Sequence, residues 1–267
     1  MPIAKVGGLD VCYERFGSGP DLLFISGTGG DLRVRPGVLD TPLAAQFSVT
    51  AYDQRGLGRT AKPVGPYTMR DYAADALGLL DYLELSRVRV IGVSFGGMVA
   101  QELALLAPAR IERLVLCCTS AGGAGGASYP LHELAALPGP ERARRGLALG
   151  DTRRTDEWRA ANPDVVARID QQAAAAAAVG ADDPDKARGA DLQLAARANH
   201  DTWQRLSGMT VPTLLCAGRY DGIAPMANME AMAVQIPSAR LEVFEGGHLF
   251  LIQDRRANPT IASWLLD

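Results

Sequence analysis

The sequence predicts an α/β fold whose central sheet is mostly parallel and covered by helices on both faces. Short apolar runs of strand length alternate along the chain with longer segments in which apolar residues recur at helical spacing. Several of these runs are apolar at nearly every position, as expected for parallel strands that are buried on both faces. Strands that alternate with helices in this way indicate a parallel sheet with helices packed on each side.

The N-terminal region contains three predicted strands. Residues 9–16 alternate apolar and polar positions, which is the period-two pattern of a half-buried strand. Residues 21–26 and 47–52 are short apolar runs, and the first of them ends in a Gly-rich turn. Between these two strands we expect a short helix within residues 36–46.

Helical spacing begins at residues 68–83, where a Thr-Met-Arg-Asp start resembles a capping box. The buried run at 88–92 predicts a strand, and the segment from 95 to 106 predicts a helix that ends before Pro108. Another buried run at 114–119 predicts the next strand. This succession continues the alternation of strands and helices.

Residues 121–207 interrupt the alternation. They are rich in Ala, Arg, Asp and Gly and contain no convincing strand, and the alanine run from Ala173 to Ala178 has high helix propensity. The segment is much longer than an ordinary loop, so we expect a helical insertion. The division that follows is a core of residues 1–120 and 208–267 with an inserted segment at 121–207.

The alternating pattern resumes after the insertion. We expect a strand at 213–217, a helix at 225–235, a strand at 241–244 and a final helix at 248–266. The second part of the core therefore continues the same sheet.

Composition and charge exclude several function classes. The chain has 267 residues, and 27 Lys and Arg against 30 Asp and Glu give a formal net charge of −3. This balance offers no basic excess for binding nucleic acid. Four cysteines are too few for a disulfide scaffold of this length, so we expect reduced thiols.

The N-terminus shows no apolar stretch typical of a secretory signal. The longest uncharged stretch, residues 114–131, contains glycines and a proline, so we expect no membrane span. These features predict a cytoplasmic protein with no nucleic-acid or membrane partner. The oligomeric state leaves no mark in the sequence, and we expect a monomer or a homodimer that acts on a small-molecule substrate.

The strongest chemical motif is Gly92-Val-Ser-Phe-Gly96, which fits G-x-S-x-G between a predicted buried strand and a predicted helix. This is the context of a nucleophile elbow, in which a sharp turn holds the serine in a strained conformation. Small residues two positions before and after Ser94 allow the backbones to cross closely. We expect Ser94 to be a nucleophile at the carboxyl end of the sheet.

A serine nucleophile needs a base, and the chain has three histidines. His248 follows two glycines directly after the last predicted strand, where a loop can reach Ser94. His132 and His200 lie in the inserted segment, and His200 closes that segment. We therefore expect His248 to be the base.

The base needs a carboxylate that orients its ring. Asp221 follows the predicted strand 213–217 and precedes a glycine, so it also lies at the carboxyl end of a strand. The rival position after the strand 114–119 carries Thr119 and Ser120 and no carboxylate. This difference favours Asp221.

An oxyanion hole requires two backbone donors. We assign one to the amide of Phe95, directly after the serine, and the other to Thr28 in the loop Ser26-Gly-Thr-Gly-Gly30.

Other residues are candidates for contact with the substrate. Gly27 lies in the oxyanion loop, Met98 flanks the serine on the predicted helix, and His200 closes the insertion. Arg33 and Arg35 follow the oxyanion loop, and the sequence leaves open whether they bind a substrate carboxylate or are solvated surface charges.

With these residues in place, the chain resembles the α/β-hydrolase superfamily. The resemblance rests on Gly92–Gly97, on Asp221 before a glycine, on His248 after two glycines, and on Asp53–Thr60, which is similar to a D-x-R-G-x-G-x-S segment of the family. The order Ser94, Asp221, His248 is also the order of that superfamily. The matching residues span nearly the whole chain, so the resemblance implies an α/β-hydrolase fold.

The resemblance also implies that residues 121–207 form a helical cap inserted after the sixth strand, and that Asp53, Arg55 and Gly56 belong to a structural loop. Within the superfamily the chain is similar to small cytoplasmic esterases of the 3-oxoadipate enol-lactonase type. It departs from the family at Ser26, where a histidine is usual.

The sequence therefore predicts a serine hydrolase of small carboxylic esters or lactones that works through an acyl-enzyme. Two alternatives remain open, namely hydrolysis of a carbon–carbon bond in a diketone-type substrate and a binding protein that retains the triad without turnover. No dinucleotide or phosphate-binding glycine motif occurs, and no His/Cys grouping has zinc spacing. We expect no cofactor and no metal.

Overall fold

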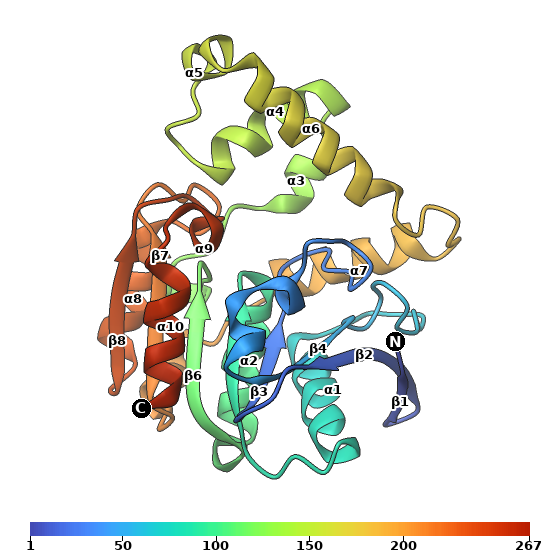
Figure 1. The fold of residues 1–267 in the computed structure, drawn as a ribbon, viewed down its shortest axis with the longest axis vertical. Coiled ribbons are helices and arrows are strands. Elements are labelled where there is room, and N and C mark those ends of the chain that lie inside the picture. The colour runs from blue at the N-terminus through green and yellow to red at the C-terminus, as the bar shows by residue number, and fades with distance from the viewer.

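The computed structural model describes residues 1–267, apart from the side chain of Leu39. Its centre is an eight-stranded sheet in the order β1-β2-β4-β3-β5-β6-β7-β8 (Figure 1). β2 runs antiparallel to its neighbours β1 and β4, and every later pair of neighbours is parallel. The strands are β1 (Ile3–Val6), β2 (Leu9–Phe16), β3 (Asp21–Ile25), β4 (Ser48–Tyr52), β5 (Val88–Val93), β6 (Ile111–Cys117), β7 (Thr213–Gly218) and β8 (Ala239–Phe244).

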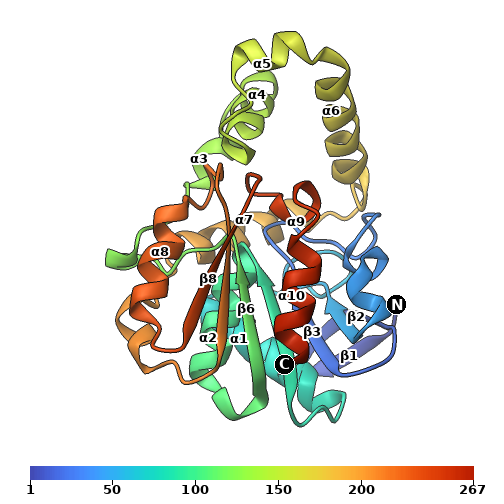
Figure 2. The ribbon, with the colours of Figure 1, turned by 60° about the vertical axis from the view of Figure 1, so that its left-hand side comes forward.

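Helices cover the sheet on both faces, which confirms the predicted fold class (Figures 1 and 2). Side chains of α1 (Met69–Tyr82), α2 (Phe95–Leu106) and α8 (Met226–Gln235) pack into one apolar core. α9 (Phe250–Gln253), α10 (Ala257–Leu266) and the short η2 (Pro42–Ala45) pack into a second core on the opposite face. Neighbouring residues of one strand divide between the two cores, as pleating requires.

No strand lies between β6 and β7 in the described part of the chain, and residues 121–207 are mainly helical. We refer to residues 121–207 as the helical segment. Figure 2 shows an arch in which α4 and α5 stand opposite α6, while α7 runs across its base above the carboxyl ends of the strands. Its α-helices are α3 (Leu131–Ala135), α4 (Gly139–Gly150), α5 (Asp156–Ala161), α6 (Pro163–Ala178) and α7 (Lys186–Ala198).

Short 3-10 turns connect several of these elements. The turns are η1 (Val38–Asp40), η3 (Pro108–Arg110), η4 (Gly123–Gly125) and η5 (Trp203–Gly208). No helix among the described residues is both long enough and apolar enough to cross a bilayer.

Several predicted boundaries need correction. β1 was not predicted, because four residues are too few to show a period. The short helix expected within 36–46 consists of two 3-10 turns, η1 and η2. The strand expected at 114–119 begins at Ile111 and ends at Cys117.

The helix expected at 248–266 is two helices, α9 and α10. Asp254 adopts an extended conformation between them, with φ of −108° and ψ of 115°. Its carboxylate accepts hydrogen bonds from the backbone N–H groups of Glu245 and Arg256, at 2.8 and 2.9 Å. A side chain that caps backbone groups in this way competes with helix continuation.

Candidate active site

Ser94 lies in the turn between β5 and α2 and has a strained backbone, with φ of 55° and ψ of −115°. Such positive φ values are rare for residues other than glycine. A Cβ atom at Gly92 would overlap the carbonyl oxygen of Gly96, and one at Gly96 would overlap that of Ile25. The two glycines therefore permit the tight crossing that presents Ser94 at the carboxyl end of β5.

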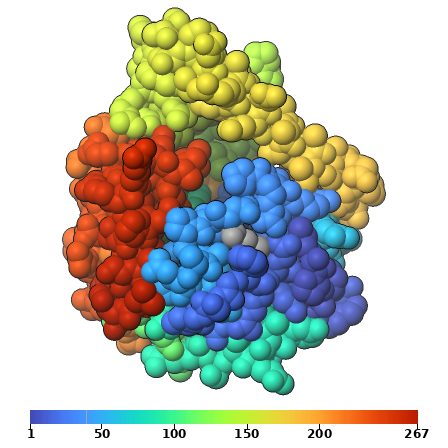
Figure 3. Space-filling model, viewed as in Figure 1, coloured from blue at the N-terminus to red at the C-terminus, as the bar shows by residue number. Residues whose placement is uncertain are grey.

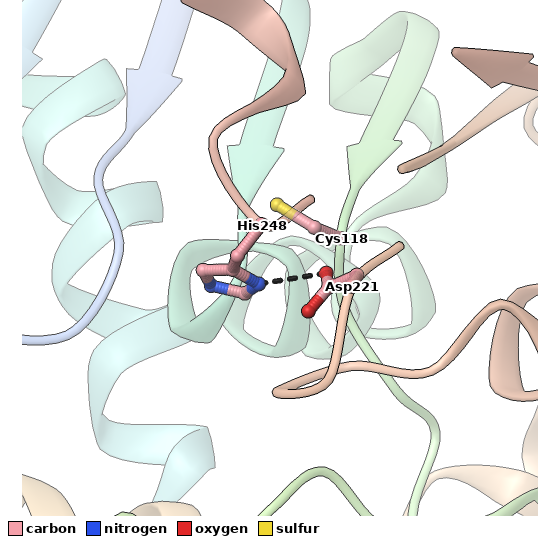
Figure 4. Close-up of side chains that lie close together, drawn as sticks. All are labelled: Cys118, Asp221 and His248. Atoms are coloured by element: carbon pink, nitrogen blue, oxygen red, sulfur yellow. Dashed lines mark hydrogen bonds and ion pairs between the residues drawn. The ribbon is translucent and has the colours of Figure 1, made fainter. Parts of the chain in front are cut away.

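The structure brings Ser94, His248 and Asp221 together from three separate loops; we refer to these residues as the triad. Nε2 of His248 lies 3.0 Å from Oγ of Ser94. Its Nδ1 lies 2.8 Å from Oδ2 of Asp221, a contact drawn as a dashed line in Figure 4. The other carboxylate oxygen of Asp221 accepts hydrogen bonds from the N–H groups of Ile223 and Ala224. The Asp221 side chain is fully buried, so these bonds hold its orientation.

The end of α4 connects the two loops that carry Asp221 and His248. The carbonyl of Gly150 accepts a 2.7 Å hydrogen bond from the N–H of His248. The carbonyl of Leu149 accepts one of 2.9 Å from the N–H of Gly222, which follows Asp221. The helical segment therefore contributes directly to the positions of Asp221 and His248.

Cys118 lies beside the acid and the base (Figure 4). Its Sγ, an oxygen of Asp221 and a nitrogen of His248 lie within 4.8 Å of one another, which is close enough to consider a metal site. Burial raises the pKa of the Cys118 thiol well above its ordinary value, which disfavours the thiolate that a metal would require. A metal would also have to replace the hydrogen bond between His248 and Asp221. The donor set does not fit a metal centre.

Two backbone amides near Ser94 donate no hydrogen bond within the described residues, those of Thr28 and Phe95. Phe95 is the first residue of α2, where N–H groups lack an intrahelical acceptor. The loop that carries Thr28 is close to the serine, because a Cβ at Gly27 would lie 3.4 Å from Cβ of Ser94. Both amides are therefore available to an oxyanion.

Side chains from two other elements hold the loop that carries Thr28. Oε1 of Gln193 on α7 accepts a 2.9 Å hydrogen bond from the N–H of Gly29. Nε2 of Gln54 donates a 2.8 Å hydrogen bond to the carbonyl of Ser26. The loop is fixed by these contacts although the usual histidine is absent. A cavity of about 480 Å³ lies against it, lined by Gly27, Thr28 and the end of α6.

The Asp53 segment has the structural role that the family resemblance implies. The buried carboxylate of Asp53 accepts hydrogen bonds from the N–H groups of Leu32 and Arg59, at 2.7 and 2.8 Å. Arg55 forms a bidentate pair with Asp75 on α1. These contacts join loops of the core and do not reach the triad.

The remaining candidates for substrate contact differ in their surroundings. Met98 is buried in the apolar core, packed with residues such as Phe95. Arg33 is paired with Asp31, and Arg35 is paired with Glu14 and Asp40. Both arginines are therefore already neutralised by the protein.

The three histidines are in different environments. His132 is exposed on α3, whereas His200 is buried just after α7. Neither ring nitrogen of His200 makes a well-aligned hydrogen bond among the described residues, although the nearby carbonyl of Ser120 favours the charged ring. Burial lowers the pKa of His200 to about 4, so its ring is neutral at physiological pH.

Gln193 and Arg197 on α7 were not predicted as site residues from the sequence. Both are buried, and Arg197 donates a 2.7 Å hydrogen bond from Nη1 to the carbonyl of Tyr129. A pattern that could have indicated them is visible in the sequence. Two long polar residues lie four positions apart in an Ala-rich segment, and His200 follows three positions after the second. Such spacing places Gln193 and Arg197 on one face of α7, and His200 follows just after the helix ends.

Comparison with known proteins agrees with this geometry. The model of the alpha/beta hydrolase fold family matches residues 20–254. The chain belongs to the α/β-hydrolase family. It resembles RutD of Azorhizobium caulinodans, for which carbamate hydrolysis is the proposed activity, at 31% identity over 94% of this chain and 92% of that protein.

Two further relatives are similar over most of their length. The poly(3-hydroxyalkanoate) depolymerase of Ectopseudomonas oleovorans is 31% identical over 86% of this chain and 78% of that protein. The crystal structure of the enol-lactonase from Burkholderia xenovorans LB400 covers 100% of both chains with a TM-score of 0.77 and 26% identity. The enol-lactonase resemblance is thereby confirmed, and the protein is a hydrolytic enzyme of the α/β-hydrolase family.

Proposed function

We propose that this α/β-hydrolase cleaves a small-molecule carboxylic ester or lactone through a serine-bound acyl intermediate. The observation that carries the proposal is the continuous hydrogen-bonded chain from Oγ of Ser94 through His248 to Asp221. This chain begins at a serine held on a strained turn and ends at a fully buried carboxylate. It is the arrangement needed to activate an alcohol as a nucleophile.

In the first half of the reaction, Oγ of Ser94 attacks the carbonyl carbon while its proton moves to Nε2 of His248. Asp221 fixes the ring through Nδ1 and stabilises the imidazolium that forms. The amides of Phe95 and Thr28 donate to the oxyanion. Collapse of the tetrahedral intermediate passes the proton from His248 to the leaving alkoxide and leaves an ester on Ser94.

In the second half, a water molecule attacks the acyl-enzyme. Nε2 of His248 takes one proton from this water, and the new oxyanion occupies the same two amides. Collapse releases the carboxylic acid and returns the proton to Oγ of Ser94. With a lactone, the alcohol and the acid leave together as one ring-opened product.

We further propose that the helical segment, residues 121–207, acts as a cap over the core formed by residues 1–120 and 208–267. In Figure 3 the surface is hollowed between the helices of this segment and the N- and C-terminal parts of the chain. The hydrogen bonds from Leu149 and Gly150 to the triad loops support a cap that shapes the site. A cytoplasmic location and a monomeric or dimeric state remain predictions of the sequence.

The experiment is intact-mass measurement after incubation with a fluorophosphonate, with Ser94→Ala beside the parent protein. We expect one adduct on the parent and none on the variant, because only an activated serine is phosphonylated. A panel of aryl esters, lactones and carbamates then identifies the scissile group.

Two outcomes contradict the proposal. An adduct with turnover only of vinylogous diketones would assign carbon–carbon hydrolysis instead. A folded protein that forms no adduct and hydrolyses nothing in the panel would favour a binding protein that retains the triad.

A further inference from the structure

α7 and the turn that follows it carry three buried polar side chains whose nitrogen atoms are not all hydrogen-bonded. Gln193, Arg197 and His200 follow one another at spacings of four and three residues and are 0%, 5% and 7% exposed. Nε2 of Gln193 and both Nε and Nη2 of Arg197 have no partner among the described residues. The ring nitrogens of His200 have none beyond the nearby carbonyl of Ser120. We refer to these three residues as the α7 face. Buried polar atoms in native proteins nearly always have partners, so such a row points to a ligand.

The contacts of the α7 face connect it to the two loops that carry Thr28 and Asp221. At one end, Gln193 bonds to Gly29, next to the oxyanion candidate Thr28. Further along, Arg197 bonds to the carbonyl of Tyr129, whose own N–H donates to Ile223 in the loop that carries Asp221. The face therefore spans the distance from the oxyanion loop to the acid loop.

Two hydroxyl groups below the α7 face are also unsatisfied. Thr28 comes after β3 in the chain, and Ser120 comes after β6. The hydroxyl oxygens of both residues are buried and have no hydrogen-bond partner in the described part of the chain. β5, which ends at Ser94, lies between β3 and β6 in the sheet. Unpartnered hydroxyl groups thus follow the two strands that flank the strand of Ser94, so a polar substrate at the serine would have free polar groups on both neighbouring loops.

Arg197 is distinguished by its charge. Burial alone lowers its pKa, to about 10, and no neighbouring carboxylate opposes that effect. The guanidinium therefore stays protonated at neutral pH without an ion-pair partner. By contrast, an ion pair with a carboxylate is formed by each of Arg33, Arg55 and Arg205. A buried cation without a counter-charge is costly, which is a strong reason to expect an anion at this position.

The free atoms of Arg197 also have the right geometry. Nε and Nη2 are the two nitrogens through which Arg33 donates hydrogen bonds to the carboxylate of Asp31, and Arg153 to that of Asp151. In Arg197 the third nitrogen, Nη1, is engaged by Tyr129, which fixes the plane of the guanidinium and leaves the two-donor edge open. That edge matches the two oxygens of a carboxylate.

We propose that Arg197 binds a carboxylate of the substrate, so that the enzyme prefers esters or lactones that carry a second, free acid group. This inference rests on the proposed ester or lactone hydrolysis at Ser94 and adds the chemical class of the substrate. Arg197 holds the acid group while the scissile carbonyl lies between Ser94 and the amides of Phe95 and Thr28. The neutral His200 and the amide of Gln193 supply further hydrogen bonds to the same end of the substrate.

The test compares 4-nitrophenyl monoesters of glutaric and adipic acid with 4-nitrophenyl pentanoate and hexanoate, which have a methyl group in place of the carboxylate. We expect the wild-type protein to have the higher kcat/KM for the charged member of each pair. Arg197→Met should reduce this preference roughly 10- to 100-fold, mainly through KM for the charged esters. Arg197→Lys should retain part of it, because the charge remains and the two-donor edge is lost.

Arg168→Met is the matched control. Arg168 is exposed on α6 of the same helical segment, so its removal should leave the preference as in the wild type. Absence of a preference in the wild type, or an unchanged preference in Arg197→Met, would overturn the inference.

A second measurement separates this inference from the proposed function. Glutarate should slow fluorophosphonate labelling of the wild type, whereas an equal ionic strength of chloride should not. This protection decides the question where Arg197→Met fails to fold. If the protein is labelled and hydrolyses neutral esters, but glutarate does not slow labelling and charged esters are not preferred, only the carboxylate site at Arg197 is overturned. Absence of both labelling and turnover would overturn the proposed function itself.

Discussion

The triad and the α7 face meet at one site and differ in how their polar atoms are satisfied. Every side-chain heteroatom of His248 and Asp221 has a partner inside the protein, and the loops of both residues are bonded to the end of α4. On the α7 face, by contrast, each of Gln193, Arg197 and His200 keeps at least one buried nitrogen without a partner. Both regions are buried, so exposure to solvent does not explain the difference.

This difference in hydrogen bonding fits two different roles, proton transfer for the triad and substrate recognition for the α7 face. Groups that move protons must be oriented before the substrate arrives, because their catalytic benefit depends on preorganisation. Groups that recognise a substrate must keep donors free, since a site that leaves them unpaired discriminates against molecules that cannot satisfy them. The comparison therefore predicts that changes in the triad affect kcat and that changes in the α7 face affect binding or stability.

The largest expected effect is that of Ser94→Ala. Loss of the nucleophile should lower kcat on the order of 10⁶-fold, the scale seen when a serine of such a triad is removed. Steady-state hydrolysis of a 4-nitrophenyl ester measures the effect, with circular dichroism to show that the fold persists. Ser207→Ala, at an exposed position, is the matched control and should keep full activity. A Ser94→Ala protein that retained most of its rate would exclude Ser94 as the nucleophile.

Asp221→Asn should have the next largest effect. The substituted amide can still accept from Ile223 and Ala224, but its NH₂ group facing Nδ1 favours the tautomer with the proton on Nε2. That tautomer cannot take the proton of Ser94, and kcat should fall by about 10⁴-fold. Hydrolysis rates at neutral pH measure this loss.

Asp191→Asn serves as the control, because Asp191 is exposed on α7. If both Asn variants kept similar activity, Asp221 would be a structural residue of its loop and not the orienting acid.

The triad could be predicted from sequence because each member is marked by local chain chemistry. Glycines flank Ser94 where backbones cross, two glycines precede His248, and a glycine follows Asp221. Each residue also comes directly after an apolar run that reads as a buried strand. In a parallel sheet the carboxyl ends of the strands meet at one edge, so three local signals combine into one site.

The α7 face could not be predicted because no local signal fixes its direction. Residues 186–198 are rich in alanine, so the period of their apolar residues does not define a buried side. Which side of α7 is buried depends on contacts with Gly29 and Tyr129, which are far away in the sequence. Arg33 and Arg35 show the converse case, because the sequence made them candidates for binding a substrate carboxylate and the fold pairs them with other residues. Their proximity to the oxyanion loop is visible in the sequence, whereas their partners Asp31, Glu14 and Asp40 are revealed only by the fold.

The third prediction concerns stability, because the buried His200 is neutral in the folded protein. Burial lowers its pKa from an ordinary 6.5 to about 4. Glu102, which is itself paired with Arg205, and the carbonyl of Ser120 oppose this effect only in part. Between these two pH values the unfolded chain binds a proton that the folded protein excludes. The free energy of unfolding should therefore fall by about 2 kcal/mol between pH 7.5 and pH 5.0 on account of this residue.

Urea unfolding of the parent and of His200→Gln at both pH values measures the effect. The variant should lose about 2 kcal/mol less than the parent over this interval, whatever its stability at pH 7.5. His132→Gln, at the exposed histidine of α3, should behave as the parent does. Equal pH dependence of all three proteins would mean that His200 finds a partner that stabilises its charged form.

Gln193→Leu tests a contact between the α7 face and the loop that carries Thr28. Gln193 belongs to the α7 face, but its Oε1 holds the N–H of Gly29 beside the oxyanion candidate Thr28. Loss of a single neutral hydrogen bond is worth about 1 kcal/mol, so kcat should fall roughly 5-fold if that bond aligns the loop. Gln172→Leu on the exposed side of α6 is the control. A fall in kcat with little change in KM would show that α7 also contributes to preorganisation. A change in KM alone would restrict the whole α7 face to substrate recognition and leave the separation between the two regions complete.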